Sequence, residues 1–208
     1  MTAAVKTVTS LPPGAGFGLS AAALLATLAA TNALFDLHHT DVALARLAHL
    51  SELHSRTGLG DVAACTGGGG IVCRTQPGIT PAITRMHGES IHIAALSLGA
   101  LSTADVITSP NEMARVTEAY PPGCAESPED FFRISRAFAE KSGLIPDEIR
   151  PALQACEANG IPASMTMLGG KGVFALGNKA FPVLSEFGTP LELHVAAKGG
   201  FRLIEVIP

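Results

Sequence analysis

The chain has 208 residues, of which 47% are apolar and 15% charged, and its formal net charge is −4 at pH 7. This length and composition predict a globular protein of one large domain or two small ones, with enough apolar residues to build a core. The negative charge and the lack of a lysine- or arginine-rich run exclude broad binding to nucleic acid or to an anionic membrane surface.

The chain begins with a predicted short strand at residues 5–8, followed by a glycine-rich loop that opens an alanine-rich helix. Gly14, Gly16 and Gly18 stand at alternate positions of the loop, so that its backbone N–H groups can converge on an anion at the helix N-terminus. The loop departs from dinucleotide-binding and Walker loops, because it continues as Leu19-Ser20. We therefore predict a phosphate-binding loop of another kind.

The helix after this loop is uncharged over residues 19–35. This stretch is rich in Ala and Thr and falls short of the roughly 20 strongly apolar residues that span a bilayer. We therefore predict a helix buried in the protein and not a membrane span. The N-terminus lacks the pattern of a signal peptide. The four cysteines form no C-x-x-C pair and have no zinc-type spacing with histidine, which predicts free thiols in a reducing cytoplasm and no disulfide framework.

A second helix is predicted over residues 41–55, with Thr40 as its N-cap. A further glycine cluster at 66–70 leads to a predicted strand at 71–74, and the segment 76–81, rich in Pro and Gly, predicts a domain boundary. We therefore expect domains at 1–80 and 81–208.

The second domain is predicted to be an α+β module. Its strands fall in pairs that favour antiparallel hairpins over parallel crossovers. The predicted helices cover 128–141 and 146–158, and the predicted strands cover 90–96, 104–107, 164–168, 173–176, 191–196 and 201–206.

Polar residues of the first domain form a candidate site for phosphoryl transfer. His49 and Glu52 have i, i+3 spacing and project from one helix face, and Asp61 follows in a glycine-rich turn. Phosphoryl transfer requires an amide cradle, a cation held by a hydroxyl and a carboxylate, and a carboxylate near the attacking alcohol. Ser20, Glu52 and Asp61 can fill these roles.

Each candidate also has a purely structural interpretation. Glu52 can pair with Arg56 at i+4 on a solvated helix face. Ser20 can be a helix N-cap and Asp61 a turn residue, while His49 can be an ordinary helical histidine. A strand-terminal arginine such as Arg74 can simply face water.

Taken together, the motifs resemble the GHMP kinases, and within them the archaeal pantoate kinases. The similarity covers most of the chain and rests on Pro12-x-Gly14-x-Gly16-Phe17-Gly18-x-Ser20, Ala48-His49-x-x-Glu52, Gly58-Leu59-Gly60-Asp61-Val62, Thr66-Gly67-Gly68 with Arg74, and Ser164-Met165-Thr166-Met167-Leu168-Gly169 with Val173-Phe174-Ala175.

The resemblance implies an ATP-dependent kinase of small alcohols, with pantoate as the acceptor. It implies that Ser20 and Glu52 hold Mg²⁺, that Asp61 orients or deprotonates the pantoate hydroxyl, and that His49 and Arg74 bind pantoate. It implies, further, that Gly169 and Gly170 support the nucleotide site. The implied ATP-binding residues are Pro13, Gly14, Ala15, Gly16, Phe17, Gly18 and Ser20.

The implied fold is α+β, with a partial ribosomal S5 domain 2-like unit followed by a ferredoxin-like unit, in a cytoplasmic protein that forms a homodimer and binds neither nucleic acid nor membrane. Only ten residues precede the loop, fewer than in such kinases, so the chain is expected to be N-terminally short. Two alternatives stay open: another acceptor, such as shikimate, homoserine or mevalonate, and a non-catalytic nucleotide-binding or interaction protein.

Overall fold

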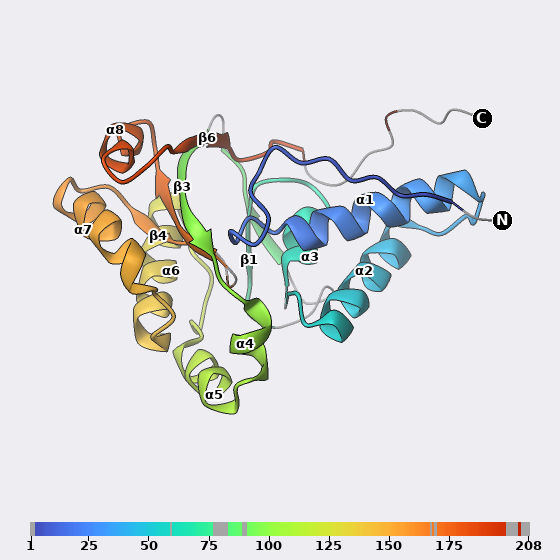
Figure 1. Cartoon of the computed structure of the whole chain (residues 1–208), viewed down its shortest axis with the longest axis horizontal. Coiled ribbons are helices and arrows are strands. Elements are labelled where there is room, and N and C mark those ends of the chain that lie inside the picture. Colours follow the sequence, from blue (N-terminus) through green and yellow to red (C-terminus); the bar gives the residue numbers. More distant parts are fainter. Residues whose placement is uncertain are drawn as a thin grey trace.

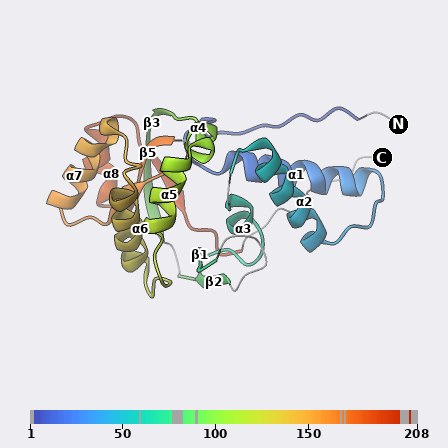
Figure 2. The same ribbon diagram turned by 90° about the horizontal axis from the view of Figure 1, so that it is seen from below.

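A computed structural model describes residues 3–58, 60–76, 83–88, 91–166, 168, 170–198 and 204. Helices α1 to α3 form one end of the molecule, and a four-stranded sheet with its own helices forms the other (Figure 1). Strands β1 and β2 lie between the two groups (Figure 2). The α+β class predicted from the sequence is confirmed.

The first end consists of α1 (Leu19–Leu34), α2 (Asp41–Ser55) and the short α3 (Asp61–Cys65). Their shared core contains Ala21, Leu25, Ala45, Ala48 and Val62. Thr40 caps α2 as predicted, because its hydroxyl accepts a hydrogen bond from the Ala43 N–H.

Two expectations for this end were wrong. Residues 5–8 form no strand, since no strand in the described part of the chain pairs with them. Helix α1 is buried along only one stripe, at Ala21 and Leu25, and Leu34 at its end is 57% exposed. Most of its remaining residues are half-buried, and Ala22, Ala26, Ala30 and Leu34 form one exposed stripe at i, i+4 spacing.

Strands β1 (Ile71–Arg74) and β2 (Ile83–Met86) pair antiparallel, with Ile71 opposite Met86. Strand β1 was predicted and β2 was not. Of the predicted boundary segment 76–81, only Gln76 lies within the described residues.

The other end contains β3 (His92–Ala100), β4 (Ala163–Met165), β5 (Gly170–Leu176) and β6 (Leu191–His194) in one sheet of order β4-β5-β3-β6. Every pairing in this sheet is antiparallel. Counted from β3, the order is 2-3-1-4, the arrangement of a ferredoxin-like sheet. The predicted antiparallel pairing is therefore confirmed.

Helices connect these strands and cover one core. They are α4 (Thr103–Thr108), α5 (Pro110–Ala119), α6 (Pro128–Ser142), the 3₁₀ turn η1 (Asp147–Ile149), α7 (Arg150–Ala158) and α8 (Ala180–Ser185). Leu96 and Val173 of the sheet pack with Ile149, Leu153 and Leu184 of the helical layer. The predicted helices near 128–141 and 146–158 are confirmed.

One predicted strand, at 104–107, is instead the helix α4. The Ser102 hydroxyl accepts a hydrogen bond from the Asp105 N–H, so a local cap outweighs the strand-like composition. Helices α5 and α8 were not predicted, and the strand predicted at 201–206 lies outside the described residues apart from Ile204.

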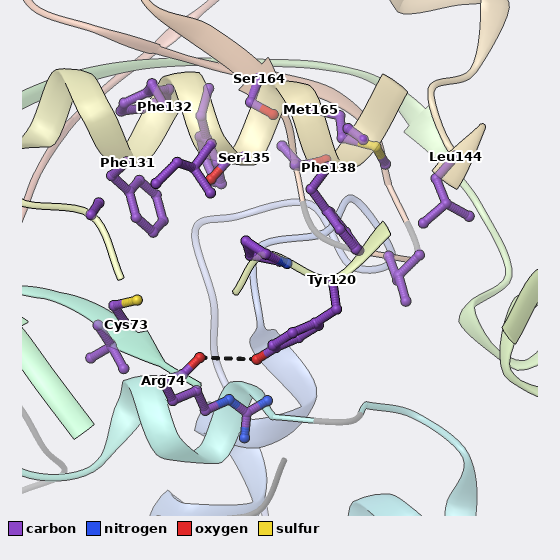
Figure 3. Close-up of a pocket in the computed structure, with 18 of the residues that line it drawn as sticks. Cys73, Arg74, Tyr120, Phe131, Phe132, Ser135, Phe138, Leu144, Ser164 and Met165 are labelled. Atoms are coloured by element: carbon purple, nitrogen blue, oxygen red, sulfur yellow. Dashed lines mark hydrogen bonds between the residues drawn. The ribbon is translucent and has the colours of Figure 1, made fainter. Parts of the chain in front are cut away.

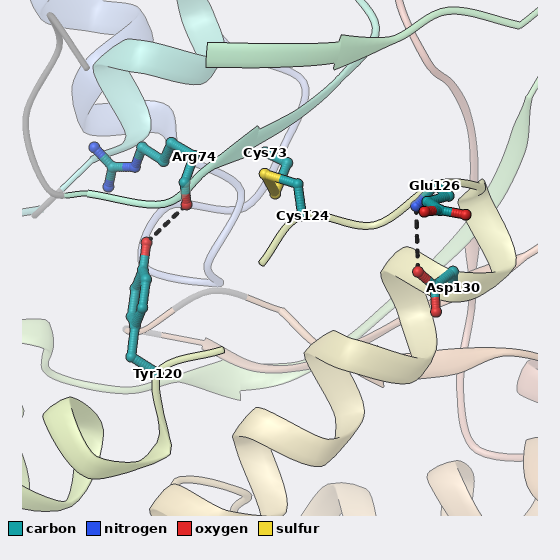
Figure 4. Close-up of a disulfide and its surroundings, with 6 residues drawn as sticks. All are labelled: Cys73, Arg74, Tyr120, Cys124, Glu126 and Asp130. Carbon is teal, nitrogen blue, oxygen red and sulfur yellow. Dashed lines mark hydrogen bonds between the residues drawn. A yellow bond between two sulfur atoms is a disulfide. The ribbon is translucent and has the colours of Figure 1, made fainter. Parts of the chain in front are cut away.

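The cysteine prediction requires a correction. Cys73 and Cys124 form a disulfide, while Cys65 and Cys156 are free thiols (Figure 4). The two bonded residues are 51 positions apart, and their Cα atoms lie 5.6 Å from each other because the loop before α6 lies next to β1. No local spacing could reveal such a pair.

No helix in the described part of the chain has the length and apolar character needed to cross a membrane.

Candidate active site

The glycine-rich loop is a left-handed turn packed against the second sheet. Gly14, Gly16 and Gly18 all have φ between 67° and 77°, a region that other residues enter only with strain. The Gly14 carbonyl accepts a hydrogen bond of 3.4 Å from the Leu101 N–H, just beyond β3. The predicted convergence of backbone amides thus has a suitable conformation.

The loop also touches β5. A Cβ atom on Gly170 would lie 2.2 Å from the Ala15 carbonyl oxygen, so only glycine permits this approach. The rings of Phe17 and Phe174 meet edge to face, with centroids 5.6 Å apart. Gly170, which was expected to support the nucleotide site, thus contacts the loop at Ala15, and Gly169 lies outside the described residues.

A cavity of about 320 Å³ lies beside the loop. Gly18, at its wall, is the N-cap residue of α1 and gives that helix no side-chain cap. The cavity therefore adjoins backbone N–H groups that can donate hydrogen bonds to a phosphate oxygen. Its described lining is Gly14, Gly16, Phe17, Gly18, Leu19, Ser20, Ser55, Arg56, Thr57, Asp61, Ser102, Thr103, Ala104 and Leu168.

Ser20 lines this cavity and contacts Glu52, which lies behind the described lining. The Ser20 hydroxyl donates a 2.7 Å hydrogen bond to Glu52 Oε1 across 32 residues of sequence. Glu52 is fully buried on α2, and a Cβ atom on Gly58 would lie 2.6 Å from its Oε1. The solvated Glu52–Arg56 pair and the Ser20 N-cap considered from the sequence are therefore both wrong.

The second oxygen of Glu52 provides a test for a cation site. Oε2 is buried and has no hydrogen-bond partner within the described residues. A buried carboxylate oxygen without a partner is costly unless a cation or proton satisfies it. Together with the Ser20 hydroxyl, it offers the hard oxygen ligands that Mg²⁺ prefers, so these residues fit such an ion.

Asp61 is the first residue of α3 and lines the same cavity. Burial raises the pKa of its carboxyl from 3.8 to about 6; the charge of Glu52 adds to the rise, and Arg74 opposes it. A carboxylate with a pKa near neutrality is suited to accept a proton from an alcohol. The interpretation of Asp61 as a mere turn residue does not describe this environment.

Arg74 ends β1 with its guanidinium against Gly60. A Cβ atom on Gly60 would lie 1.5 Å from Arg74 Nη2, so the glycine provides the space that the guanidinium fills. The Arg74 carbonyl accepts a 2.9 Å hydrogen bond from the Tyr120 hydroxyl. Arg74 is thus fixed at the strand end and its charge acts on Asp61, in contrast to an arginine that only faces water.

The remaining predicted residues are less closely grouped. His49 lies one turn before Glu52 on α2, and its Nδ1 is buried without a hydrogen-bond partner in the described part of the chain. It does not line the cavity beside the loop, and neither does Pro13, which is exposed.

Arg85 on β2 is a supporting residue that sequence reasoning missed. Its guanidinium donates to the carbonyls of Gly69, at 2.8 Å, and of Ala63, at 3.2 Å, and also to Thr66. Ala63 lies in the last turn of α3, and Thr66 and Gly69 follow it, so Arg85 fixes the segment between Asp61 and β1. Nothing in the sequence around Arg85 indicates this role, because its partners lie 16 to 22 residues away.

A second cavity, of about 430 Å³, has Arg74 in its lining. Aromatic and aliphatic side chains such as Phe131, Phe138 and Met165 line it, and Tyr120 stands between them and β1 (Figure 3). In the same view the Arg74 guanidinium points away from Phe131 and Phe138.

Comparisons with known proteins agree with this geometry. The sequence profile of the GHMP kinases N terminal domain matches residues 2–69. A pantoate kinase of Methanospirillum hungatei is 43% identical over 96% of this chain and 68% of its own length. A pantoate kinase of Thermococcus kodakarensis is 34% identical over 88% of this chain and 63% of its own length.

Solved structures show the same fold. A phosphotransferase related to the CoA biosynthesis pathway superposes with a TM-score of 0.68 at 31% identity, covering 91% of this chain and 65% of that one. Mevalonate kinase of L. major, at 17% identity and a TM-score of 0.59, covers 92% of this chain and 69% of that one and shares the fold. This chain thus spans about two thirds of the length of its relatives. Because it is 43% identical to a pantoate kinase and covers 68% of that protein, it belongs to the GHMP kinase family.

Proposed function

We propose that the protein is a pantoate kinase, which transfers the γ-phosphoryl group of ATP to a hydroxyl of pantoate and forms 4-phosphopantoate for coenzyme A biosynthesis. The observation that carries this proposal is the Ser20–Glu52 pair next to Asp61 and a left-handed glycine loop, in a chain 43% identical to a pantoate kinase.

The glycine loop would hold the ATP phosphates through its backbone amides, and Asp61 would face the acceptor. The pantoate hydroxyl oxygen attacks the γ-phosphorus, its proton moves to the Asp61 carboxylate, and the bond from the γ-phosphorus to the bridging oxygen breaks to release ADP. Catalysis of this kind depends on positioning and on stabilising charge. The raised pKa of Asp61 keeps its proton affinity high enough for the transfer.

Ser20 and Glu52 are the residues that we assign to Mg²⁺. When bound, the ion neutralises charge on the β- and γ-phosphate oxygens. The Ser20 hydroxyl and the unpartnered Oε2 of Glu52 would face it.

Arg74 and His49 are the residues that we assign to pantoate. A guanidinium matches a carboxylate through paired hydrogen bonds, and Arg74 already stands near Asp61, where the acceptor must bind. His49, one turn from Glu52, would bind pantoate through its unpartnered Nδ1.

We also propose the wider organisation that the family implies: a nucleotide-binding domain at 1–80, a second domain at 81–208, a homodimer and a cytoplasmic location. Because Cys73 and Cys124 are bonded to each other, the cysteines do not support that location. The use of ATP as phosphoryl donor still does.

The test is ADP release by this 208-residue chain with ATP, Mg²⁺ and a panel of pantoate, shikimate, homoserine and mevalonate. We expect ADP release when pantoate is the acceptor and none with the other three acceptors. The Asp61→Asn variant should release no ADP with pantoate. Turnover with another acceptor would replace pantoate in the proposal. Nucleotide binding without any turnover would instead support a non-catalytic protein.

A further inference from the structure

Three metal-ligating side chains gather at the edge of the second sheet, far from the phosphate loop. Strands β3 and β6 pair so that His92 stands opposite His194 and Ala94 opposite Glu192. Because alternate residues of a strand face the same side, Glu192 and His194 share a face, and His92 joins them from the neighbouring strand.

The distances fit a common centre. His92 Nδ1 lies 3.5 Å and His194 Nε2 3.9 Å from Glu192 Oε1, and one ligand atom from each residue lies within 4.8 Å of the others. Ligands of a tetrahedral ion at about 2.0–2.2 Å are about 3.4 Å apart, so only small side-chain rotations separate this arrangement from coordination.

The burial of His92 adds an independent observation. Its Nδ1 is fully buried yet has no hydrogen-bond partner in the described part of the chain, although the side chain as a whole is 29% exposed. A buried ring nitrogen without a hydrogen bond needs another partner, and it faces the Glu192 carboxylate across 3.5 Å. A metal ion between the two would satisfy both atoms.

We propose that His92, Glu192 and His194 form a binding site for a divalent transition-metal ion of the zinc type. Two imidazoles and one carboxylate are ligands that Zn²⁺ or Co²⁺ accepts, whereas Mg²⁺ prefers oxygen alone. A cavity of about 190 Å³ next to His92 and Glu192 leaves room for water at a fourth position.

This site is separate from the proposed kinase centre. His92 and Ala100 stand at opposite ends of β3, roughly 26 Å apart at about 3.3 Å per residue, and it is the Ala100 end that contacts the glycine loop. The metal would join β6 to β3, the strand next to it in the described sheet, where four residue pairs form the register between them. Its effect is therefore expected on the stability of this edge and not on phosphoryl transfer.

The experiment titrates the full chain, freed of metal by a chelator, with Zn²⁺ in a calorimeter and with Co²⁺ in a visible spectrometer. We expect one equivalent of Zn²⁺ to bind and to raise the Tm, and Co²⁺ to give the intense visible bands of a four-coordinate ion. His194→Ala should weaken binding at least about a hundred-fold, since changes even to residues behind the ligands cost 10–100-fold.

His38→Ala is the matched control, because His38 also pairs with a carboxylate, Asp36, but belongs to no such cluster among the described residues. It should bind Zn²⁺ as the parent does. Glu192→Gln, at an exposed position, covers the case in which a histidine variant does not fold. Lack of stoichiometric Zn²⁺ binding, or parental affinity in both His194→Ala and Glu192→Gln, would overturn the proposal.

Discussion

Gly60→Ala should disable the proposed acceptor site while leaving the protein folded. The added Cβ atom would lie 1.5 Å from Arg74 Nη2 and 2.3 Å from Cζ. A carbon–nitrogen contact needs about 3.5 Å, so the guanidinium must move by about 2 Å. The φ of Gly60 is −176°, outside the left-handed region that favours glycine.

The expected loss of activity follows from the hydrogen bonds to pantoate that Arg74 would lose. A hydrogen bond between charged groups contributes roughly 1.5–3 kcal/mol, which corresponds to about a 10- to 150-fold loss in kcat/KM for pantoate. The KM for ATP should change little. Because the end of a flexible side chain is displaced, the free energy of unfolding should fall by less than about 1 kcal/mol.

The assay is steady-state ADP release with each substrate varied in turn, together with urea unfolding. Gly123→Ala is the matched control, because nothing lies within 4 Å of the Cβ position there. If Gly60→Ala acts through the guanidinium, it should add almost nothing to Arg74→Ala. An equal further loss in the Arg74→Ala background, or an unfolded Gly60→Ala protein, would refute the reasoning.

Three further predictions concern single residues. Between pH 3.8 and about 6 the folded state holds a proton on Asp61 that the unfolded state releases, so the free energy of unfolding falls as the pH rises. Asp61→Asn removes this loss and should therefore stabilise the metal-free protein by about 3 kcal/mol at pH 8 and by nothing at pH 3, measured by thermal unfolding. Cys124→Ser opens a loop of 51 residues closed by Cys73 and should cost about 4 kcal/mol in guanidinium unfolding under oxidising conditions, with no difference after reduction. Arg85→Ala removes the guanidinium that donates to carbonyls at the end of α3 and just after it, and it should lower the free energy of unfolding by about 2 kcal/mol; an unchanged urea midpoint would contradict this role.

Local sequence determined the elements that carry the proposed site. Alternating glycines followed by alanines fix a left-handed turn before a helix, and Thr40 fixes the start of α2, because these signals act within a few residues. The spacing of Glu52 from Asp61, and the likeness of the whole pattern to GHMP kinases, could be read in the same way.

Only the tertiary structure decided what these residues contact. The bond from Ser20 to Glu52 spans 32 residues and the disulfide at Cys73 spans 51, and each depends on packing that no local pattern encodes. Burial, which raises the pKa of Asp61, and the strand register that groups His92 with His194, likewise appear only when distant segments meet. Contacts between distant segments are set by the whole fold, and here the fold turned separate residues into sites.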